Sequence, residues 1–302
     1  MFSKVYSAAL SGIESRIISV EVDVSDGLPS FSMVGYLTSE VREAQDRVRT
    51  AIRNTGFSLM PKKVTVNLAP GDLRKSGSGF DLPIATAMLA AYALISQSSL
   101  DGIFLAGELG LDGSIHGIHG ILGMVMEARR AGLRACVIPQ QNVREGAVIE
   151  GIAVYGAESL EEVVEHLRGT KRIRQTAINI EEKFSEVCQS GCLDFADIHG
   201  QRWVKRAAEI AVAGMHHLLI SGPPGSGKTM IAKRIPGILP PLEVDEALEI
   251  SQIHSVAGIL PKSGLVTQRP FRMPHHTISP VALTGGGVVP KPGEISLAHR
   301  GV

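Results

Sequence analysis

The first 170 residues alternate between strand-like and helix-like patterns of apolar positions. Residues 5–10 and 17–24 alternate apolar and polar side chains, which predicts two strands. Residues 39–56 and 80–94 have helical patterns, and the second is so apolar that we expect it to be buried against a sheet. The same criteria predict strands at 64–68, 103–106 and 135–138, and helices at 121–131 and after the capping box Ser159-x-x-Glu162. A domain of mixed α and β structure is expected.

A different pattern follows at residues 217–235. Leu218, Leu219 and Ile220 form a short apolar run that predicts a buried parallel strand, and a helical pattern begins at Met230. The loop between them matches G-x-x-x-x-G-K-[ST] at every position. Its residues are Gly222, Pro223, Pro224, Gly225, Ser226, Gly227, Lys228 and Thr229.

The chemistry of polyphosphate explains the residue types in this loop. Backbone N–H groups can wrap a phosphate only where no Cβ blocks the approach, so glycine recurs. We expect the Lys228 ammonium to reach the β- and γ-phosphates and the Thr229 hydroxyl to bind Mg²⁺. The start of the following helix adds its dipole. The predicted cofactors are therefore ATP and Mg²⁺, and the alternative is a glycine-rich turn without a ligand.

Length and composition bound the remaining possibilities. At 302 residues the chain is longer than one hydrophobic core usually spans, so two domains are expected. Hydrophobic residues make up 44% and charged residues 20%, which excludes general disorder. Thirty basic residues balance thirty acidic ones, so composition offers no argument for nucleic acid or for an anionic membrane. Any contact with DNA must be a local patch.

The cysteines are few and odd in number: Cys136, Cys188 and Cys192. This usage fits a reducing compartment, so a cytoplasmic protein is expected. Cys188-x₃-Cys192 lacks a second pair of ligands, and we interpret both as free thiols rather than a zinc site. The N-terminus has no signal-peptide core, and no run approaches the ~18 apolar residues of a membrane span, so neither export nor insertion is expected.

Two glycine-rich stretches, residues 75–85 and 106–120, resemble in order and spacing the proteolytic domain of the Lon family. The resemblance implies a ribosomal-S5-like α/β fold. It places the family's nucleophilic serine at Gly79 and its general-base lysine at Met124, and these two residues cannot form a Ser/Lys dyad. Ser76 and Ser78 lack an activating lysine on the helix at 121–126. We therefore expect residues 1–168 to form an inactive Lon-protease-like domain.

His116 and His119 lie in the second of these stretches without a third metal ligand, and we interpret them as turn or surface residues. Beyond residue 168 the apolar positions no longer follow a strand or helix pattern. A basic cluster opens the region, and residues 169–190 are predicted to be a linker. The second domain is expected to begin at residue 191.

Residues 195–200, FADIHG, precede a predicted helix at 201–213 and resemble the N-terminal segment of AAA+ domains. That resemblance implies that Ile198 packs on the adenine base. Four further stretches, at 233–241, 253–258, 269–276 and 292–299, resemble the magnesium-chelatase-like AAA+ proteins. The YifB/ComM group of that family joins an inactive Lon-like domain to this ATPase core, and the whole chain is similar to it.

The resemblance implies a ring, expected to be a homohexamer, that hydrolyses ATP. The energy would drive branch migration of branched or single-stranded DNA during natural transformation, and the protein would thus act as a helicase. Two alternatives stay open: a metal-insertion ATPase subunit as in magnesium chelatase, and an ATP-dependent peptidase. His275 and His276 are interpreted as loop residues. The nearby basic side chains could engage a DNA strand or be ordinary surface charge; they are Lys262, Arg269, Arg272 and Lys291.

Hydrolysis by a P-loop ATPase also needs an apolar strand that ends in Asp or Asp-Glu, the Walker B strand. No such pattern follows Thr229, so no catalytic residue is predicted. Residues 191–302 are expected to be the first part of an AAA+ domain, truncated before Walker B, that binds ATP without hydrolysing it. The acidic residues after the loop either lie on a predicted helix or, in one case, follow Lys-Pro-Gly; they are Glu243, Asp245, Glu246, Glu249 and Glu294.

Overall fold

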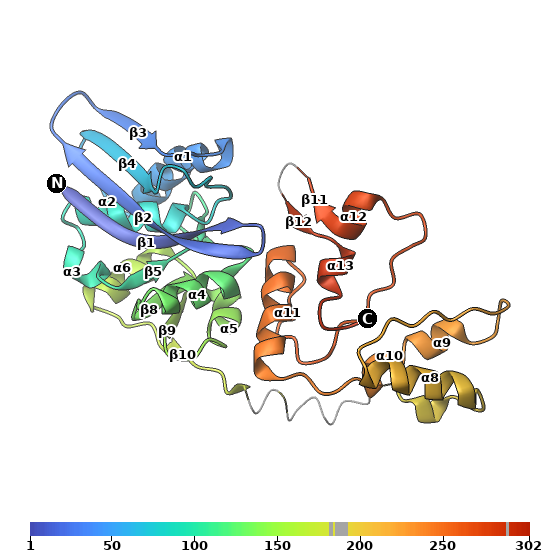
Figure 1. Cartoon of the computed structure of the whole chain (residues 1–302). Coiled ribbons are helices and arrows are strands. Elements are labelled where there is room, and N and C mark those ends of the chain that lie inside the picture. Colours follow the sequence, from blue (N-terminus) through green and yellow to red (C-terminus); the bar gives the residue numbers. More distant parts are fainter. Residues whose placement is uncertain (181–183, 185–192, 288–289) are drawn as a thin grey trace. The chain divides into compact units, whose positions relative to one another are not determined.

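The computed structural model describes residues 1–180, 184, 193–287 and 290–302. The chain divides into two compact units (Figure 1). The first consists of Met1–Ile178 together with Ser255–Gly264, and the second of Asn179–His254 together with Leu265–Val302. Within the described residues, no helix is both long enough and apolar enough to cross a bilayer. Residues 181–183 and 185–190 of the predicted linker lie outside the described residues, and its bounds stay a prediction.

The first unit holds most of the regular structure. Its strands are β1 (Phe2–Ser11), β2 (Glu14–Ser25), β3 (Ser30–Val34), β4 (Lys63–Ala69), β5 (Ile103–Leu105), β6 (Glu108–Leu109), β7 (Ile115–His116), β8 (Ala135–Pro139), β9 (Ala153–Ala157) and β10 (Gln175–Thr176). Its helices are α1 (Ser39–Asn54), α2 (Asp81–Ala91), α3 (Gln97–Leu100), α4 (Ile121–Arg130), the 3₁₀ turn η1 (Gln140–Asn142), α5 (Val143–Gly146) and α6 (Leu160–Arg168).

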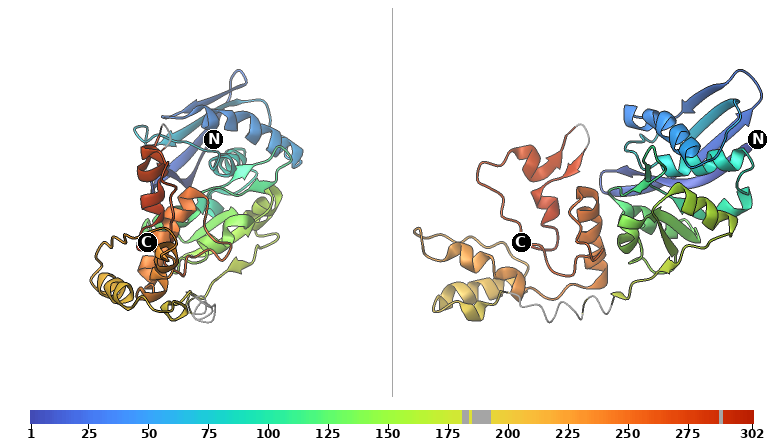
Figure 2. Two further views of the ribbon diagram at one scale, coloured as in Figure 1. Left: turned by 90° about the vertical axis from the view of Figure 1, so that its right-hand side faces the viewer. Right: turned by 180° about the vertical axis from the view of Figure 1, so that it is seen from behind.

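One mixed sheet organises this unit, in the order β10-β9-β8-β5-β1-β2-β4-β3. The long β1–β2 hairpin runs antiparallel from Phe2↔Asp23 to Ser11↔Glu14 and is drawn in blue in Figures 1 and 2. β5, β8 and β9 extend the sheet in parallel, and β3 pairs with β4 in parallel at the far edge. The sequence therefore predicted the mixed α/β class correctly.

Helices cover both faces of the sheet. Ala9 belongs to the core that α2 shares with β1 and β2, whereas its neighbour Leu10 lies against Gly120 at the start of α4. Because successive side chains of a strand point to opposite faces, α2 and α4 lie on opposite sides. α2 is buried on nearly its whole surface, which confirms the prediction from its apolar composition. The Ser159 hydroxyl caps α6 by accepting the Glu162 N–H at 3.2 Å, as predicted.

The second unit has little sheet among its described residues. Its elements are η2 (Phe195–Asp197), α8 (Arg202–Ala213), α9 (Lys228–Ala232), α10 (Ile235–Ile238), α11 (Val244–Ala257, whose last residues belong to the first unit), α12 (Pro280–Thr284), α13 (Glu294–Leu297) and the two short strands β11 (Gly285–Gly286) and β12 (Lys291–Pro292). A small core of Phe195, Ile198, Ala208, Ile231 and Ile235 joins η2, α8, α9 and α10.

The strand predicted at 218–220 is not formed, and this prediction was wrong. Leu219 is 93% exposed, and the segment carries no regular structure. A strand persists only when a neighbouring strand satisfies its backbone groups, and the described residues provide no such neighbour here. Two backbone hydrogen bonds hold Val302 in this unit: its carbonyl oxygen accepts from the Arg272 N–H at 2.7 Å, and its N–H donates to the Pro270 carbonyl at 2.9 Å.

Candidate nucleotide-binding site

The glycine-rich loop predicted to bind phosphate is open to solvent and directly precedes α9. Gly225 and Gly227 have φ of 77° and 83°, left-handed values that favour glycine. α9 itself spans only Lys228–Ala232, so the helix dipole expected from the sequence is that of little more than one turn. The loop therefore offers a phosphate mainly its backbone N–H groups and one lysine, and only a small contribution from the helix dipole.

The Lys228 ammonium is folded back over this loop. Its Nζ donates to the carbonyl oxygens of Gly222 at 2.8 Å and Pro223 at 2.7 Å, and lies 3.4 Å from the Ser226 hydroxyl. These partners are neutral, and the two carbonyl oxygens belong to exposed residues, so a phosphate oxygen with its full charge could replace them. The position of the cation fits the role that the motif predicts for it.

Thr229, the predicted Mg²⁺ ligand, is exposed, and its hydroxyl has no hydrogen-bond partner in the described parts of the chain. A free hydroxyl beside a phosphate site suits Mg²⁺, which keeps several waters and takes few protein ligands. Elsewhere in the described residues, no three His, Cys, Asp or Glu side chains come together as a metal site. The donors present therefore fit a metal that arrives with the nucleotide.

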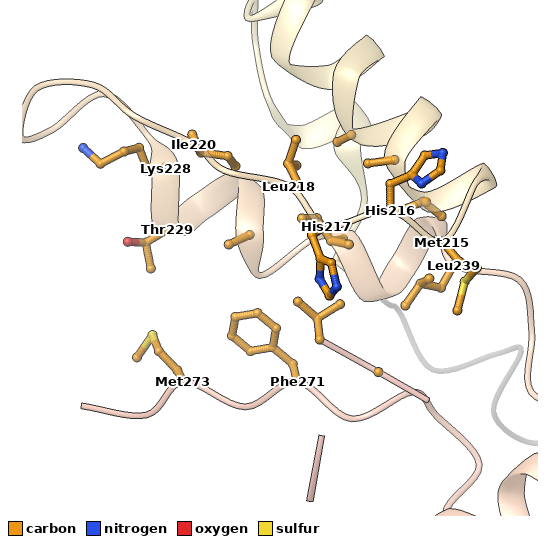
Figure 3. A pocket seen from close by; sticks show the side chains of 17 residues that line it. Met215, His216, His217, Leu218, Ile220, Lys228, Thr229, Leu239, Phe271 and Met273 are labelled. Carbon is orange, nitrogen blue, oxygen red and sulfur yellow. The ribbon is translucent and has the colours of Figure 1, made fainter. Parts of the chain in front are cut away.

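A cavity of about 740 Å³ opens beside the loop within the second unit. Figure 3 shows Lys228 and Thr229 at one end, Met215 and Leu239 at the other, and His217 and Phe271 between them. The lining is mostly apolar, and it includes Leu218 and Ile220 of the predicted strand together with Phe271 and Val302. The apolar run therefore faces a cavity on one side, where a sheet was expected.

Ile198, which the AAA+ resemblance places against adenine, is 2% exposed in the core of the second unit. It packs in one cluster with Ile231 of α9, so it lies close to the helix that follows the phosphate loop. Its carbonyl oxygen accepts a hydrogen bond from the Lys205 ammonium. The contact of Ile198 with an adenine base stays a prediction.

The acidic residues after the loop are mostly paired with arginine. Arg272 donates to both carboxylate oxygens of Glu294, at 2.6 and 2.7 Å, and these hydrogen bonds hold the pKa of Glu294 below its ordinary value of 4.5. Arg300 donates to Glu249 at 3.1 Å. Glu246 contacts Arg269 at 2.8 Å. These carboxylates are committed to structure rather than free to orient water.

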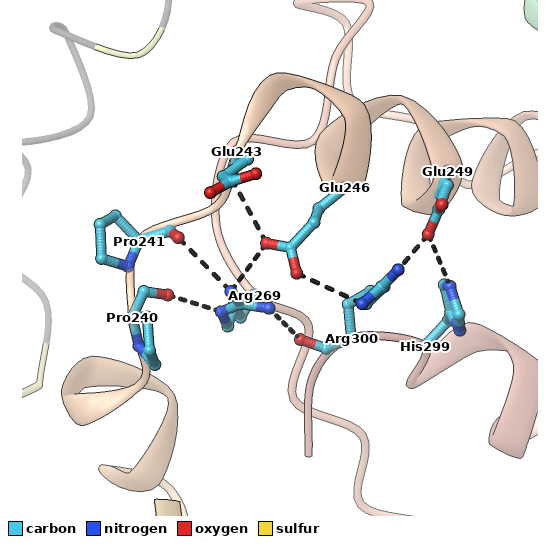
Figure 4. Close-up of polar contacts among 8 residues, drawn as sticks. All are labelled: Pro240, Pro241, Glu243, Glu246, Glu249, Arg269, His299 and Arg300. Atoms are coloured by element: carbon cyan, nitrogen blue, oxygen red, sulfur yellow. Dashed lines mark hydrogen bonds and ion pairs between the residues drawn. The ribbon is translucent and has the colours of Figure 1, made fainter. Parts of the chain in front are cut away.

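Figure 4 shows how Arg269 joins parts of this unit. The Arg269 side chain is 8% exposed. Its guanidinium donates to Pro240 O at 2.6 Å, Arg300 O at 2.8 Å and Glu246 at 2.8 Å, and so ties three segments together. Arg269 and Arg272 were candidates for engaging DNA. Both guanidinium groups are paired within the unit, and their contact with DNA stays a prediction. Lys262 and Lys291 stay exposed.

In the Lon-like region, a side chain at the expected nucleophile position would have to displace the end of the Ile118 side chain. A Cβ at Gly79 would lie 2.8 Å from Cδ1 of Ile118, and Met124 is 6% exposed inside α4. The Ser78 hydroxyl donates to Glu108. Next to it, Asp81 is fully buried and accepts from Arg47 at 2.7 and 3.0 Å. The Ser78 hydroxyl and the Asp81 carboxylate are thus both engaged in polar contacts, and the inactivity of this region stays a prediction.

A buried lysine was missed by sequence reasoning. Lys75 is 0% exposed, and its ammonium donates to the Pro70 carbonyl. Burial lowers its pKa. The ammonium bonds to this carbonyl rather than to the hydroxyl of Ser76 or Ser78, so it supplies neither with a base. The sequence held no signal of this, because a lysine within a polar loop is expected to be exposed.

The histidines and the described cysteine have ordinary structural surroundings. His116 is exposed and 3.2 Å from the Ser114 hydroxyl, and His275 is exposed and 2.7 Å from the Thr277 hydroxyl. Cys136 is a buried thiol whose pKa is raised by burial. Cys188 and Cys192 lie outside the described residues.

Two family models each match one part of the chain. The family model described as "Magnesium chelatase, subunit ChlI" matches residues 194–302, and that described as "Subunit ChlI of Mg-chelatase" matches residues 20–142. The chain is 42% identical over 298 residues to "Competence protein ComM" of Haemophilus influenzae and 43% identical over 300 residues to "Uncharacterized protein YifB" of Escherichia coli. In both cases 99% of this chain and 58% of the relative are covered.

A weaker similarity, 26% identity over 173 residues, links 53% of this chain to 21% of the Lon protease of Acinetobacter baumannii. A Lon-like region combined with a phosphate-loop region defines the class of protein. The chain belongs to the magnesium-chelatase-like family that includes ComM and YifB. It spans somewhat less than three fifths of the length of these relatives.

Proposed function

We propose that the chain binds ATP with Mg²⁺ through residues 222–229, as the nucleotide-binding part of an AAA+ ATPase. The observation that carries this proposal is the position of the Lys228 ammonium, which is held over the glycine-rich loop by weak neutral partners. ATP would take the ammonium from these carbonyls, and Thr229 would contribute its free hydroxyl to Mg²⁺. Membership of the chelatase-like family supports the same assignment.

Calorimetric titration with ATP and Mg²⁺ tests this proposal. Lys228→Ala is expected to weaken binding by about 10- to 100-fold, because a charge-assisted contact with phosphate is lost. Lys233→Ala is the matched control, since Lys233 is exposed just after the same short helix and should leave affinity unchanged. Equal affinity of the wild-type chain and Lys228→Ala would refute the assignment.

We also propose that these 302 residues bind ATP without turning it over. The support for this is that Glu246, Glu249 and Glu294, three of the five acidic residues after the loop, are engaged by arginine. Phosphate release is expected at background. Sustained release that disappears in Lys228→Ala would contradict the proposal, and its loss in Glu294→Gln would identify Glu294 as the missing carboxylate.

For the whole protein we propose a ring, a homohexamer, that remodels branched or single-stranded DNA in the cytoplasm. Its support is the identity to a relative whose name records a role in competence. A metal-insertion ATPase is the second candidate, since both family models carry the name of the chelatase subunit. A peptidase has less support, because Gly79 faces Ile118.

ATP turnover by the whole protein separates these candidates. Branched DNA should stimulate phosphate release, and a porphyrin or casein should not. Stimulation by a porphyrin alone would favour metal insertion. Peptide cleavage coupled to turnover would overturn the proposal that the Lon-like region is inactive.

A further inference from the structure

The chain has a single tryptophan, and it lies on the surface of the second unit. Trp203 belongs to the first turn of α8 and is 88% exposed. Tryptophan is highly buried on average, and its large ring is enriched where proteins contact partners. An indole left almost entirely in water therefore indicates a surface that a partner or a ligand covers.

Trp203 begins an exposed stripe along α8 (Figure 1). Ala207 and Ile210 follow it at intervals of four and three residues, the spacing that places side chains on one side of a helix. Both are exposed, Ile210 to 54%. The buried residues of the helix, Ala208 and Ala211, lie on another side and line the cavity beside the phosphate loop. The stripe is thus a part of α8 that the described residues of its own unit leave uncovered.

Positive charge borders the stripe. Arg202 and Arg206 are four residues apart, so their side chains are neighbours on the helix, and Arg206 is also three residues from Trp203. Arg202 is exposed, with no hydrogen bond or ion pair to any described residue. Arg206 pairs with Glu209 at 2.9 Å, but both side chains are at least half exposed, and such a pair contributes little. Both guanidinium groups are therefore available to an anion.

These features distinguish between two kinds of partner. A stable interface between two copies of the chain buries about 800 Å² on each copy, and its centre is depleted of charge. The stripe has only two large apolar side chains, Trp203 and Ile210, with cations directly beside them. Single-stranded nucleic acid needs less surface: an aromatic ring on which a base stacks, and cations that contact the phosphates. Size and charge thus favour single-stranded nucleic acid.

We propose that α8 carries a stacking site for single-stranded nucleic acid, in which a base stacks on Trp203 while Arg202 and Arg206 contact neighbouring phosphates. Arg206 exchanges Glu209 for a phosphate, because charge-assisted hydrogen bonds to phosphate are stronger than an exposed ion pair. Every base has a face that can stack, so binding is largely independent of sequence. The choice of DNA as the ligand rests on the proposed function.

The fluorescence of Trp203 tests the site directly, because no other residue of the chain is a tryptophan. Titration of the unmodified chain with oligo(dT), without ATP, should quench this emission saturably as a base stacks on the indole. Anisotropy of a labelled oligo(dT) then compares variants. Trp203→Ala should weaken binding by about 5- to 150-fold, the effect of losing one stacked base.

Two further replacements separate stacking from simple apolar contact. Trp203→Phe keeps an aromatic ring and should recover most of the affinity lost in Trp203→Ala, whereas Trp203→Leu should not. Because Trp203 is 88% exposed, none of these changes removes core packing. Tyr36→Ala is the matched control, since Tyr36 is an aromatic residue of the first unit, 56% exposed, and its loss should leave affinity unchanged.

The salt dependence of binding tests the part of the cations. Arg202→Ala should reduce the slope of log affinity against log salt concentration by about 0.7, because one phosphate contact is lost. A parallel titration with oligo(U) identifies the source of the ligand. Tighter binding of oligo(dT) than of oligo(U) assigns DNA to the site, and the reverse order keeps the site and assigns RNA.

Absence of quenching, or equal affinity of Trp203→Ala and the unmodified chain, would overturn the proposal. Affinity retained in Trp203→Leu would do the same, because leucine cannot stack. A blue shift of the emission that grows with protein concentration, without nucleic acid, would show that a second copy covers α8 and would also refute the site.

DNA-stimulated phosphate release by the whole protein keeps this result apart from the proposed function. If DNA stimulates release and Trp203→Ala changes neither the stimulation nor the affinity for oligo(dT), the activity on DNA stands and the site on α8 fails. If oligo(dT) binds through Trp203 but DNA does not stimulate release, the site stands and the proposed activity on DNA fails.

Discussion

At the scale of single residues, the immediate surroundings of a side chain decide which chemistry is possible. Gly79 stands where the Lon resemblance places a nucleophile, and the Ile118 side chain fills the space beyond its Cα. At Lys228 the same level of detail favours chemistry, because the ammonium is held by carbonyls that a phosphate can replace. In each case the residue type sets which functional group is present, and the neighbouring residues decide which contacts that group can make.

Gly79→Ala should lower the free energy of unfolding by about 0.5–1.5 kcal/mol, since the new methyl group must displace the end of the Ile118 side chain from its rotamer. Gly71→Ala is the matched control, because no atom lies within 4 Å of the position that its new methyl group would occupy and φ is not left-handed there. Urea denaturation measures both. Restoring space with Ile118→Ala should make the double variant less destabilised than the sum of the single changes. Strict additivity would show that Ile118 is not the obstacle.

His166 gives the first unit a pH dependence. Its Nδ1 accepts the Ile173 N–H at 3.0 Å, and burial lowers its pKa below the ordinary 6.5. The unfolded chain therefore binds more protons than the folded chain between pH 6.5 and the lowered pKa, so stability falls as pH drops through that window. The melting temperature should decline less steeply below pH 6.5 in His166→Phe, which keeps a ring beside Tyr155. Parallel curves for the two proteins would rule out His166 as the source.

At the scale of elements, the two units are held together internally by different forces. The first unit rests on an eight-stranded sheet with apolar helices on both faces. In the second, short helices and irregular segments are joined by arginine side chains, with Arg269 as the clearest case. Backbone carbonyls that a sheet would satisfy are here satisfied by a guanidinium.

Arg269→Ala should therefore destabilise the second unit by about 3 kcal/mol, because removal of a buried cation takes one donor from Glu246 and the donor from three carbonyl oxygens. Arg269→Lys should restore little, since one ammonium cannot reach four acceptors in different directions. Arg206→Ala is the control, as the Arg206–Glu209 pair is exposed and should contribute less than about 1 kcal/mol. Thermal unfolding followed by circular dichroism compares them, and equal shifts for Arg269→Ala and Arg206→Ala would contradict this account.

At the scale of the whole molecule, the chain unites a Lon-like unit with a phosphate-loop unit in one polypeptide without net charge. Zero net charge gives no long-range attraction to DNA, so any contact with nucleic acid depends on local surfaces and on assembly. This makes oligomerisation the property that matters most for the proposed activity.

The whole protein should form a larger particle when ATP is added, and Lys228→Ala should not, because assembly is expected to follow nucleotide binding. Sedimentation velocity with and without ATP measures this. Lys233→Ala should assemble like the wild type. A particle whose size does not depend on ATP or on Lys228 would contradict the proposed ring mechanism.

The sequence alone determined the features that repeat at short range. Alternation predicted β1 and β2, apolar composition predicted the burial of α2, and the Ser159 cap followed from a four-residue motif, because each depends on neighbours within a few positions. The motif at 222–229 likewise needed only eight consecutive residues to indicate a phosphate ligand.

Only the tertiary structure decided what depends on distant partners. The run at 218–220 has the composition of a strand, yet a strand also requires a neighbour for its backbone, and none forms among the described residues. Arg269 and Lys75 would be taken for surface charges until their acceptors, far away or hidden within a loop, are known. Glu145 and Ser255 are 110 positions apart, and no local pattern brings them together. Short-range periodicity can be read directly from the order of residues. The burial of a side chain and its pairing with a distant partner are decided only when the chain has folded.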